Sequence, residues 1–181
     1  MADTGWISPG TGSEDATIGT QSWDLYSGYD LSGIFAADDS NIEGAYFYSA
    51  ATTKYIVGSN FGFSIPEGAT IDGILVEILQ KGNNTVENSI KIVKGGTIQG
   101  DENSTEVSLP STYTYVSYGG SDDLWGLSWS DTDINASTFG VGFAVDGYNY
   151  NDDAYVDHIR IKVYYTEGGA TSAPFPMFFR P

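Results

Sequence analysis

The sequence predicts an all-β protein: an antiparallel β-sandwich with jelly-roll-like connections, about eight strands and one short helix. Three observations lead to this class. The 181 residues include 23 Gly, 13 Tyr and 9 Phe, a composition typical of short strands joined by turns. Several segments alternate apolar and polar residues, and no long segment follows the 3.6-residue helical period. Gly-rich, Asn-rich and Pro-containing turn signals separate these segments.

The clearest strand is predicted at residues 155–165. Its alternation puts three β-branched residues on one face and three basic side chains on the other: Ile159, Ile161 and Val163 against His158, Arg160 and Lys162. Such a pattern indicates a sheet with one buried face. A second strand at residues 71–81 has apolar residues on both faces, so we expect it in the centre of a sheet.

A third strand is predicted at residues 139–146. One of its faces carries large apolar side chains. The other face, with Gly140 and Gly142, is smooth enough for a backbone or ring to approach closely. The remaining strand candidates are residues 44–49, 54–63, 89–94, 105–109 and 113–118.

One short helix is predicted on a crossover between strands. Ser130 followed three residues later by Asp133 is a capping pattern, and it leads into residues 134–137. We expect one or two helical turns there.

Charge and composition exclude several function classes. The 7 basic and 24 acidic residues give a net charge of −17, which disfavours binding to nucleic acid or to an anionic membrane. The absence of Cys excludes disulfides, thiolate metal sites and cysteine nucleophiles. No apolar run of membrane-spanning length occurs, and the first ten residues do not resemble a secretory signal.

Catalytic motifs are weak, and we predict that the protein is not an enzyme and has no catalytic residues. His158 is the single histidine, so a Ser-His-Asp triad would need it as the base. Its place in the middle of a predicted strand favours an exposed sheet histidine instead. Carboxylate pairs suited to glycoside hydrolysis are inevitable among 24 acidic residues, so they carry little weight.

Acidic loops suggest calcium as the one metal to consider. Candidate clusters are Asp38 with Asp39, Asp122 with Asp123, and residues 146–153. Carboxylate and carbonyl oxygens are the ligands that Ca²⁺ prefers. None of the clusters has the spacing of an EF-hand, and solvated loops are the favoured interpretation. We therefore expect no cofactor and leave the metal question open.

Aromatic residues raise a carbohydrate hypothesis. Trp125 and Trp129 lie beside Asp122 and Asp123, a combination of ring faces and carboxylates that suits a sugar. Trp6, Trp23, Tyr148 and Tyr150 are further candidates for such a platform. The alternative is that the loop folds back and buries its tryptophans, which is the usual fate of aromatic residues.

Residues 1–166 are predicted to form one sandwich domain with an N-terminal extension, and residues 167–181 a flexible spacer with an apolar arm. The arm contains Phe175, Met177, Phe178 and Phe179 among three prolines, so we expect it to be extended. Burying four such side chains contributes roughly 6–12 kcal/mol, so the arm should dock. It docks either on its own sandwich or on a neighbouring subunit. The region around Trp6 is the second candidate for an assembly contact, and the smooth strand face at Gly140 and Gly142 is the third.

Four segments together resemble a group of β-sandwich virion structural proteins of tailed bacteriophages, of the decoration, head-fibre or tail-associated type. These segments are NFGFSIPEGATIDGILVEI (60–78), IKIVKGG (90–96), YGGSDDLWG (118–126) and VDHIRIKVYYT (156–166). The resemblance covers residues 44–166 and carries no site residues with it. It implies a location in the virion after synthesis in the host cytoplasm, with other virion proteins and further copies of the chain as partners.

The leading functional hypothesis is therefore a non-enzymatic phage structural protein that assembles in multiple copies through its termini. A negative charge this large would repel packaged DNA, so such a protein should face outward or belong to the tail. The alternative is a carbohydrate-binding or host-adhesion module that uses Trp125 and Trp129 on host-surface glycans. A subunit of a surface layer or an extracellular filament is a third hypothesis, which the lack of a signal sequence disfavours.

Overall fold

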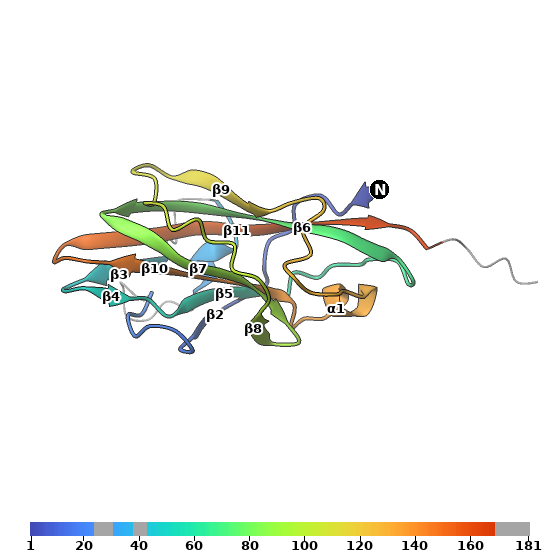
Figure 1. Ribbon diagram of the computed structural model, residues 1–181, viewed down its shortest axis with the longest axis horizontal. Helices are drawn as coiled ribbons and strands as arrows, with labels where there is room; N and C mark the ends of the chain where they lie inside the picture. The colour runs from blue at the N-terminus through green and yellow to red at the C-terminus, as the bar shows by residue number, and fades with distance from the viewer. Residues whose placement is uncertain (24–30, 38–42, 169–181) are drawn as a thin grey trace, which may run out of the picture.

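The computed structural model describes residues 1–23, 31–37 and 43–168, and these form two antiparallel sheets packed face to face (Figure 1). The first sheet has the order β1-β11-β6-β9, with β3 also paired to β11. The second has the order β2-β5-β10-β7-β8, with β4 also paired to β10. The all-β sandwich predicted from the sequence is confirmed.

The described residues contain eleven strands, one 3-10 turn and one short α-helix. The strands of the first sheet are β1 Ala2–Asp3, β3 Glu43–Phe47, β6 Thr70–Asn83, β9 Thr114–Gly119 and β11 Asp152–Thr166. Those of the second are β2 Thr11–Asp15, β4 Ala51–Thr52, β5 Tyr55–Ser59, β7 Thr85–Lys94, β8 Thr97–Gln99 and β10 Gly140–Gly147. The 3-10 turn is η1 Ser32–Ile34 and the helix is α1 Asp131–Asn135.

Three segments of the chain, called ribbons below, each cross from one sheet to the other at the same end of the molecule. They are β3–β5, β6–β7 and β10–β11, and all turn at the left of Figure 1. The β10–β11 ribbon is the middle one, because β11 pairs with β6 and β3 while β10 pairs with β7, β5 and β4. The eight strands at the centre form two sheets of order β3-β11-β6-β9 and β5-β10-β7-β8, which is a jelly-roll arrangement. We call this end of the sandwich the closed end.

The predicted alternation in β11 is confirmed by its burial. Ile159, Ile161 and Val163 are fully buried between the sheets. The central position predicted for residues 71–81 is also found, since β6 lies between β11 and β9. The core continues through both sheets, and its largest fully buried aromatic residues are Trp23, Phe47, Trp125, Phe139 and Phe143.

The N-terminal extension adds a short strand to each sheet. Ala2 and Asp3 pair with the end of β11, Ile7 bridges to Ile161, and Thr11–Asp15 then pairs with β5. Because β1 is antiparallel to the last residues of β11, Ala2 lies opposite Tyr165. Both ends of the described chain therefore leave the sandwich at the end opposite the closed end (Figure 1).

The helix forms as the capping pattern predicts. The Ser130 hydroxyl accepts a hydrogen bond from the Asp133 N–H, and the Asp133 carboxylate accepts one from the Ser130 N–H. These reciprocal bonds satisfy backbone donors that the first turn leaves open. Ile134 is buried and fixes the helix to the core.

The strand expected at residues 105–109 is wrong. Glu106 has a φ of +54°, which breaks an extended chain, and the segment contributes only an isolated bridge from Ser108 to Val86. Strands β1, β2, β4 and β8, which are not among the predicted strands, have two to five residues each. Their pairing is set by distant partners and leaves little local pattern.

The smooth face of β10 is not open, as an attachment surface would require. A Cβ on Gly142 would lie 3.1 Å from the Tyr55 ring and 3.2 Å from Ile98. Tyr55 belongs to a second, smaller cluster that packs on this side of the sheet. The chain itself therefore covers the face that the sequence left as a candidate contact.

Close strand pairing should make Gly140 intolerant of any side chain. A Cβ there would lie 2.1 Å from the Gly58 carbonyl oxygen, so β5 and β10 would have to separate. We expect Gly140→Ala to lower the free energy of unfolding by about 1–3 kcal/mol in urea titrations. Gly120→Ala is the matched control, because the nearest atom to its Cβ is 3.7 Å away. Equal stability of the two variants would contradict the strand spacing.

Candidate functional site

The closed end gathers aromatic side chains from two different turns. Along β3, Ala45 and Phe47 point into the core, so Tyr46 and Tyr48 point outward. Tyr150 reaches the same place from the turn between β10 and β11, because Asp153 pairs with Tyr46. Tyr46, Tyr48 and Tyr150 are named the tip cluster below.

The three rings of the tip cluster contact one another. The ring centroids of Tyr46 and Tyr48 are 5.0 Å apart, those of Tyr48 and Tyr150 6.0 Å, and those of Tyr46 and Tyr150 6.3 Å. The Tyr46 hydroxyl donates to the side-chain oxygen of Asn151. Desolvation, then the neighbouring Tyr150 and Tyr48, raise the pKa of Tyr46. The Tyr46 phenol therefore remains a neutral hydrogen-bonding group at physiological pH.

The turn that carries Tyr150 is held by one buried carboxylate. Asp152 is 1% exposed and accepts hydrogen bonds of 2.8 Å from the backbone N–H groups of both Tyr148 and Asn149. Burial alone would raise the pKa of Asp152, but these bonds outweigh it and keep the pKa below its usual range. Asn151 takes the left-handed conformation, with a φ of +71°. The turn thus holds its shape without help from the tyrosine rings.

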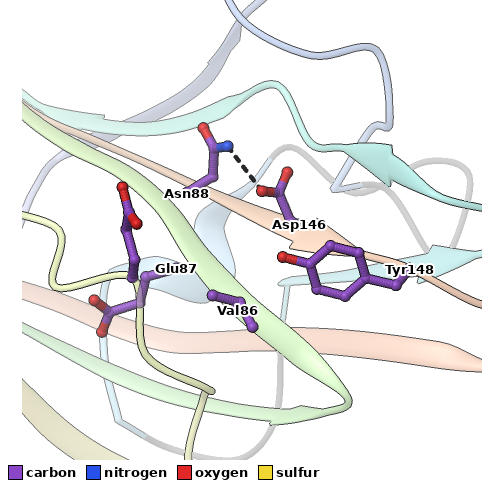
Figure 2. A pocket seen from close by; sticks show the side chains of 6 residues that line it. Val86, Glu87, Asn88, Asp146 and Tyr148 are labelled. Atoms are coloured by element: carbon purple, nitrogen blue, oxygen red, sulfur yellow. Dashed lines mark hydrogen bonds between the residues drawn. The ribbon is translucent and has the colours of Figure 1, made fainter.

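A shallow hollow of about 270 Å³ lies on the second-sheet side of the closed end. Figure 2 shows Val86, Asn88, Asp146 and Tyr148 around this space. Asn88 donates to the Asp146 carboxylate at 2.9 Å, and Thr52 donates to its other oxygen at 2.5 Å. Glu87 and Glu106 complete the lining. The hollow is therefore polar and acidic, and its carboxylate at Asp146 is already hydrogen-bonded.

The loop carboxylates proposed for calcium cap backbone and amide groups. Asp123 accepts from the Trp125 N–H at 2.7 Å and from the Asn103 amide at 3.1 Å. Asp146 and Asp152 are engaged as described above. Asp38 and Asp39 lie outside the described residues. Within the described ranges, no group of three acidic or histidine side chains is arranged to hold a metal ion.

The tryptophan platform proposed for glycans is not formed as predicted. Trp125 is fully buried, and its indole N–H donates to the Ile74 carbonyl at 3.0 Å. Trp129 is half-buried, with its ring edge against Phe139 and Lys94 above its face at 5.1 Å. The loop folds back onto the core, so Trp125 is a core residue and not a glycan contact. Asp122 is exposed and Asp123 is half-buried beside this loop.

Trp6 packs on the outer face of its own first sheet. The Arg160 guanidinium lies between the rings of Trp6 and Tyr115, at 4.5 and 3.9 Å from their centroids. Lys162 also lies over Trp6, and Glu77 binds Arg160 at 2.5 Å. Trp6 is half-buried in this stack. The other predicted assembly contacts, Phe175, Met177, Phe178 and Phe179, lie outside the described residues.

His158 is buried, contrary to the exposed position predicted from the strand pattern. It is 8% exposed, because the N-terminal segment and β9 cover it. One ring nitrogen is hydrogen-bonded to the Ser8 hydroxyl and the other to the Tyr115 hydroxyl, both at 2.8 Å. The partners come from residues 150 and 43 positions away in the chain, so the strand pattern alone gives no sign of them. This arrangement holds the first residues onto the sheet.

A buried polar network inside the closed end was not anticipated from the sequence. Tyr118 accepts a hydrogen bond from the Gln80 amide at 2.8 Å and donates to Glu87 at 2.7 Å. Glu87 also accepts from the backbone and hydroxyl of Thr105. Burial, and then the nearby Glu87 charge, raise the pKa of Tyr118 well above its usual value. Gln80 lies on the same face of β6 as the buried residues Val76 and Ile78. This alternation is the sequence signal that could have predicted its burial.

Comparison with protein-family models and with curated proteins finds no match to this chain. None of the helices in the described part of the chain has the length and apolar character needed to cross a lipid bilayer.

The burial of His158 should make stability depend on pH. Burial, and then the charge of Arg160, lower the pKa of His158, so the unfolded chain takes up a proton before the folded protein does. The free energy of unfolding should therefore fall as the pH drops below about 6.5. We expect His158→Gln to show a shallower fall between about pH 7.5 and about pH 5.5 in urea titrations. Equal pH slopes for the two proteins would argue against a neutral, buried His158.

Proposed function

We propose that this protein is a non-enzymatic structural component of a phage virion, a capsid decoration, head-fibre or tail-associated protein held through its termini. The observation that supports this most directly is the polarity of the sandwich. Ala2 lies opposite Tyr165, so the N-terminal segment and the segment leading to residues 169–181 leave from the same end. The closed end lies opposite (Figure 1). An attached module with one end bound and the other presented outward needs this arrangement.

The segments that resemble phage virion proteins include the structural centre of the fold. Residues 60–78 and 156–166 contribute most of β6 and β11, which pair along nearly their full length. Residues 90–96 and 118–126 supply the end of β7 and the loop that buries Trp125. The resemblance therefore concerns the elements that fix the sandwich and supports a common architecture.

Charge decides how such a module would be held. Of the seven cations, Arg180 lies outside the described residues, and each of the other six makes an internal ion pair, ring contact or hydrogen bond. The remaining surface is strongly acidic, so copies of the chain repel one another. Attachment would then rest on apolar contacts, for which Phe175, Met177, Phe178 and Phe179 are the proposed residues.

Removal of the arm should separate folding from assembly. The main core cluster extends from Trp23 to Val163, so a chain ending at residue 168 keeps all of it. We expect this truncated protein to fold with an unchanged thermal midpoint but to be absent from purified virions, measured by quantitative mass spectrometry of the particle fraction.

A second variant tests whether the apolar side chains, and not the length of the arm, are responsible. Replacing Phe175, Met177, Phe178 and Phe179 by Ser should reproduce the loss of incorporation at full length. Normal incorporation of both variants would contradict the proposed role of the arm. Failure of the full-length protein to enter any particle would contradict the virion assignment itself.

A further inference from the structure

Exposed apolar surface is concentrated at the closed end. Among the described residues, the large apolar side chains with most exposure are Met1, Tyr48, Val107, Tyr148 and Tyr150. Three of these five are tyrosines in two of the three turns at the closed end. Tyr48 is 71% exposed and Tyr150 is 64% exposed. Neighbouring exposed rings such as these form a contiguous apolar patch, which is a candidate interaction site.

The tip cluster is not needed to fold the end on which it lies. Its rings contact one another and not the main core. The turn between β10 and β11 is already fixed by Asp152, whose carboxylate binds two backbone N–H groups. Phe47, directly between Tyr46 and Tyr48, supplies the core contact of this part of β3. The exposed phenols are therefore available for a partner.

We infer that the tip cluster binds a neutral glycan. The face of an aromatic ring carries partial negative charge, which attracts the partially positive C–H bonds on the flat side of a pyranose. The Tyr48 and Tyr150 rings are neighbours, with centroids 6.0 Å apart and planes inclined by 55°, and both are mostly exposed, so one ligand can reach both rings. Tyrosine side chains have few rotatable bonds, which limits the entropy lost on binding.

Amide side chains at the same end of the sandwich supply the polar half of such a site. Asn83, Asn149 and Asn151 are exposed, and Asn83 donates to the Asn151 carbonyl at 3.4 Å across the two turns. An amide both donates and accepts, as adjacent sugar hydroxyls require. The Tyr46 hydroxyl is held by Asn151, which positions the cluster against these amides.

The charge of this end selects among glycans. Asp146, Asp153 and Glu106 lie around the closed end, and the whole chain carries −17. Sialic acids and uronic acids would be repelled, whereas an uncharged oligosaccharide would not. The exposed residues of these turns are mostly tyrosines and amides, which fits a sugar better than an apolar peptide.

This inference rests on the proposed function, because a glycan site at the closed end is useful when the opposite end is anchored. The isolated protein is applied to an immobilised panel of neutral hexose and N-acetylhexosamine oligosaccharides, with sialylated and uronic-acid oligosaccharides alongside. The neutral oligosaccharide with the strongest signal is then titrated by calorimetry. We expect Tyr48→Ala and Tyr150→Ala each to weaken binding about five- to tenfold.

Matched variants separate stacking from other effects. Tyr48→Phe and Tyr150→Phe keep the ring faces and should stay within about twofold of the parent protein. Tyr148→Ala removes an exposed phenol on the side of the hollow and should leave the affinity unchanged. Thermal midpoints of all variants should match, since these side chains are exposed.

Three results would overturn the inference. They are the absence of any neutral glycan signal, a preference for anionic glycans, and unchanged affinity in the Tyr48→Ala, Tyr150→Ala double variant. A loss of affinity confined to Trp129→Ala would place the site on the half-buried tryptophan instead. The double variant should still enter virions, so failure of the glycan site is distinguishable from failure of the virion assignment.

Discussion

The pairing of the β10–β11 ribbon with the β6–β7 ribbon is the interaction on which the rest of the structure depends. β11 pairs with β6 in one sheet while β10 pairs with β7 in the other, so one pair of ribbons builds the centre of both layers. The two sheets then enclose Ile78, Ile92, Phe143 and Ile161, and the sequence has no cysteine that could form a disulfide. The same pairing brings both ribbon turns to the closed end, with the β3–β5 turn beside them. The position of Tyr150 next to Tyr46 is a consequence of this register.

Many of the strands and the helix could be predicted from local sequence. Which distant segments cover the faces of the sheets could not. The alternation of residues 155–165 and the Ser130 capping pattern each involve only residues close in the chain, so both can be recognised in the sequence. His158 shows the limit, because its parity puts it on the outer face and only Ser8 and Tyr115, from distant segments, bury it. Trp125 is similar: its burial depends on a hydrogen bond to Ile74 that no spacing rule reveals. The tip cluster needs the register of β3 and β11, which is itself a long-range result.

The acidic surface follows from how the few cations are used. Lys54 binds Glu14, Arg160 binds Glu77 between two aromatic rings, and Lys81 lies over Tyr113 and Tyr155. These contacts hold the edges and outer faces of the sheets in place. Because the six described basic side chains are engaged in contacts within the chain, they do not neutralise the remaining carboxylates at the surface. Many of those in turns, such as Asp123 and Asp152, serve as caps for backbone N–H groups. The net charge is thus a by-product of turn chemistry that also restricts the partners the surface can accept.

The closed end differs from the rest of the molecule because its exposed aromatic side chains are not needed for folding. Tyr48 and Tyr150 leave most of their surface in water, and Asp152 already fixes the turn that Tyr150 belongs to. Serine, asparagine or aspartate at these two positions would satisfy the same backbone and improve solubility. Stability therefore gives no reason for phenol rings to be present there. A surface contact does, because only a contact benefits from flat apolar faces that are held rigidly and remain accessible. The clustering of these rings at the end opposite residues 1 and 168 is the arrangement that such a contact would favour in an anchored protein.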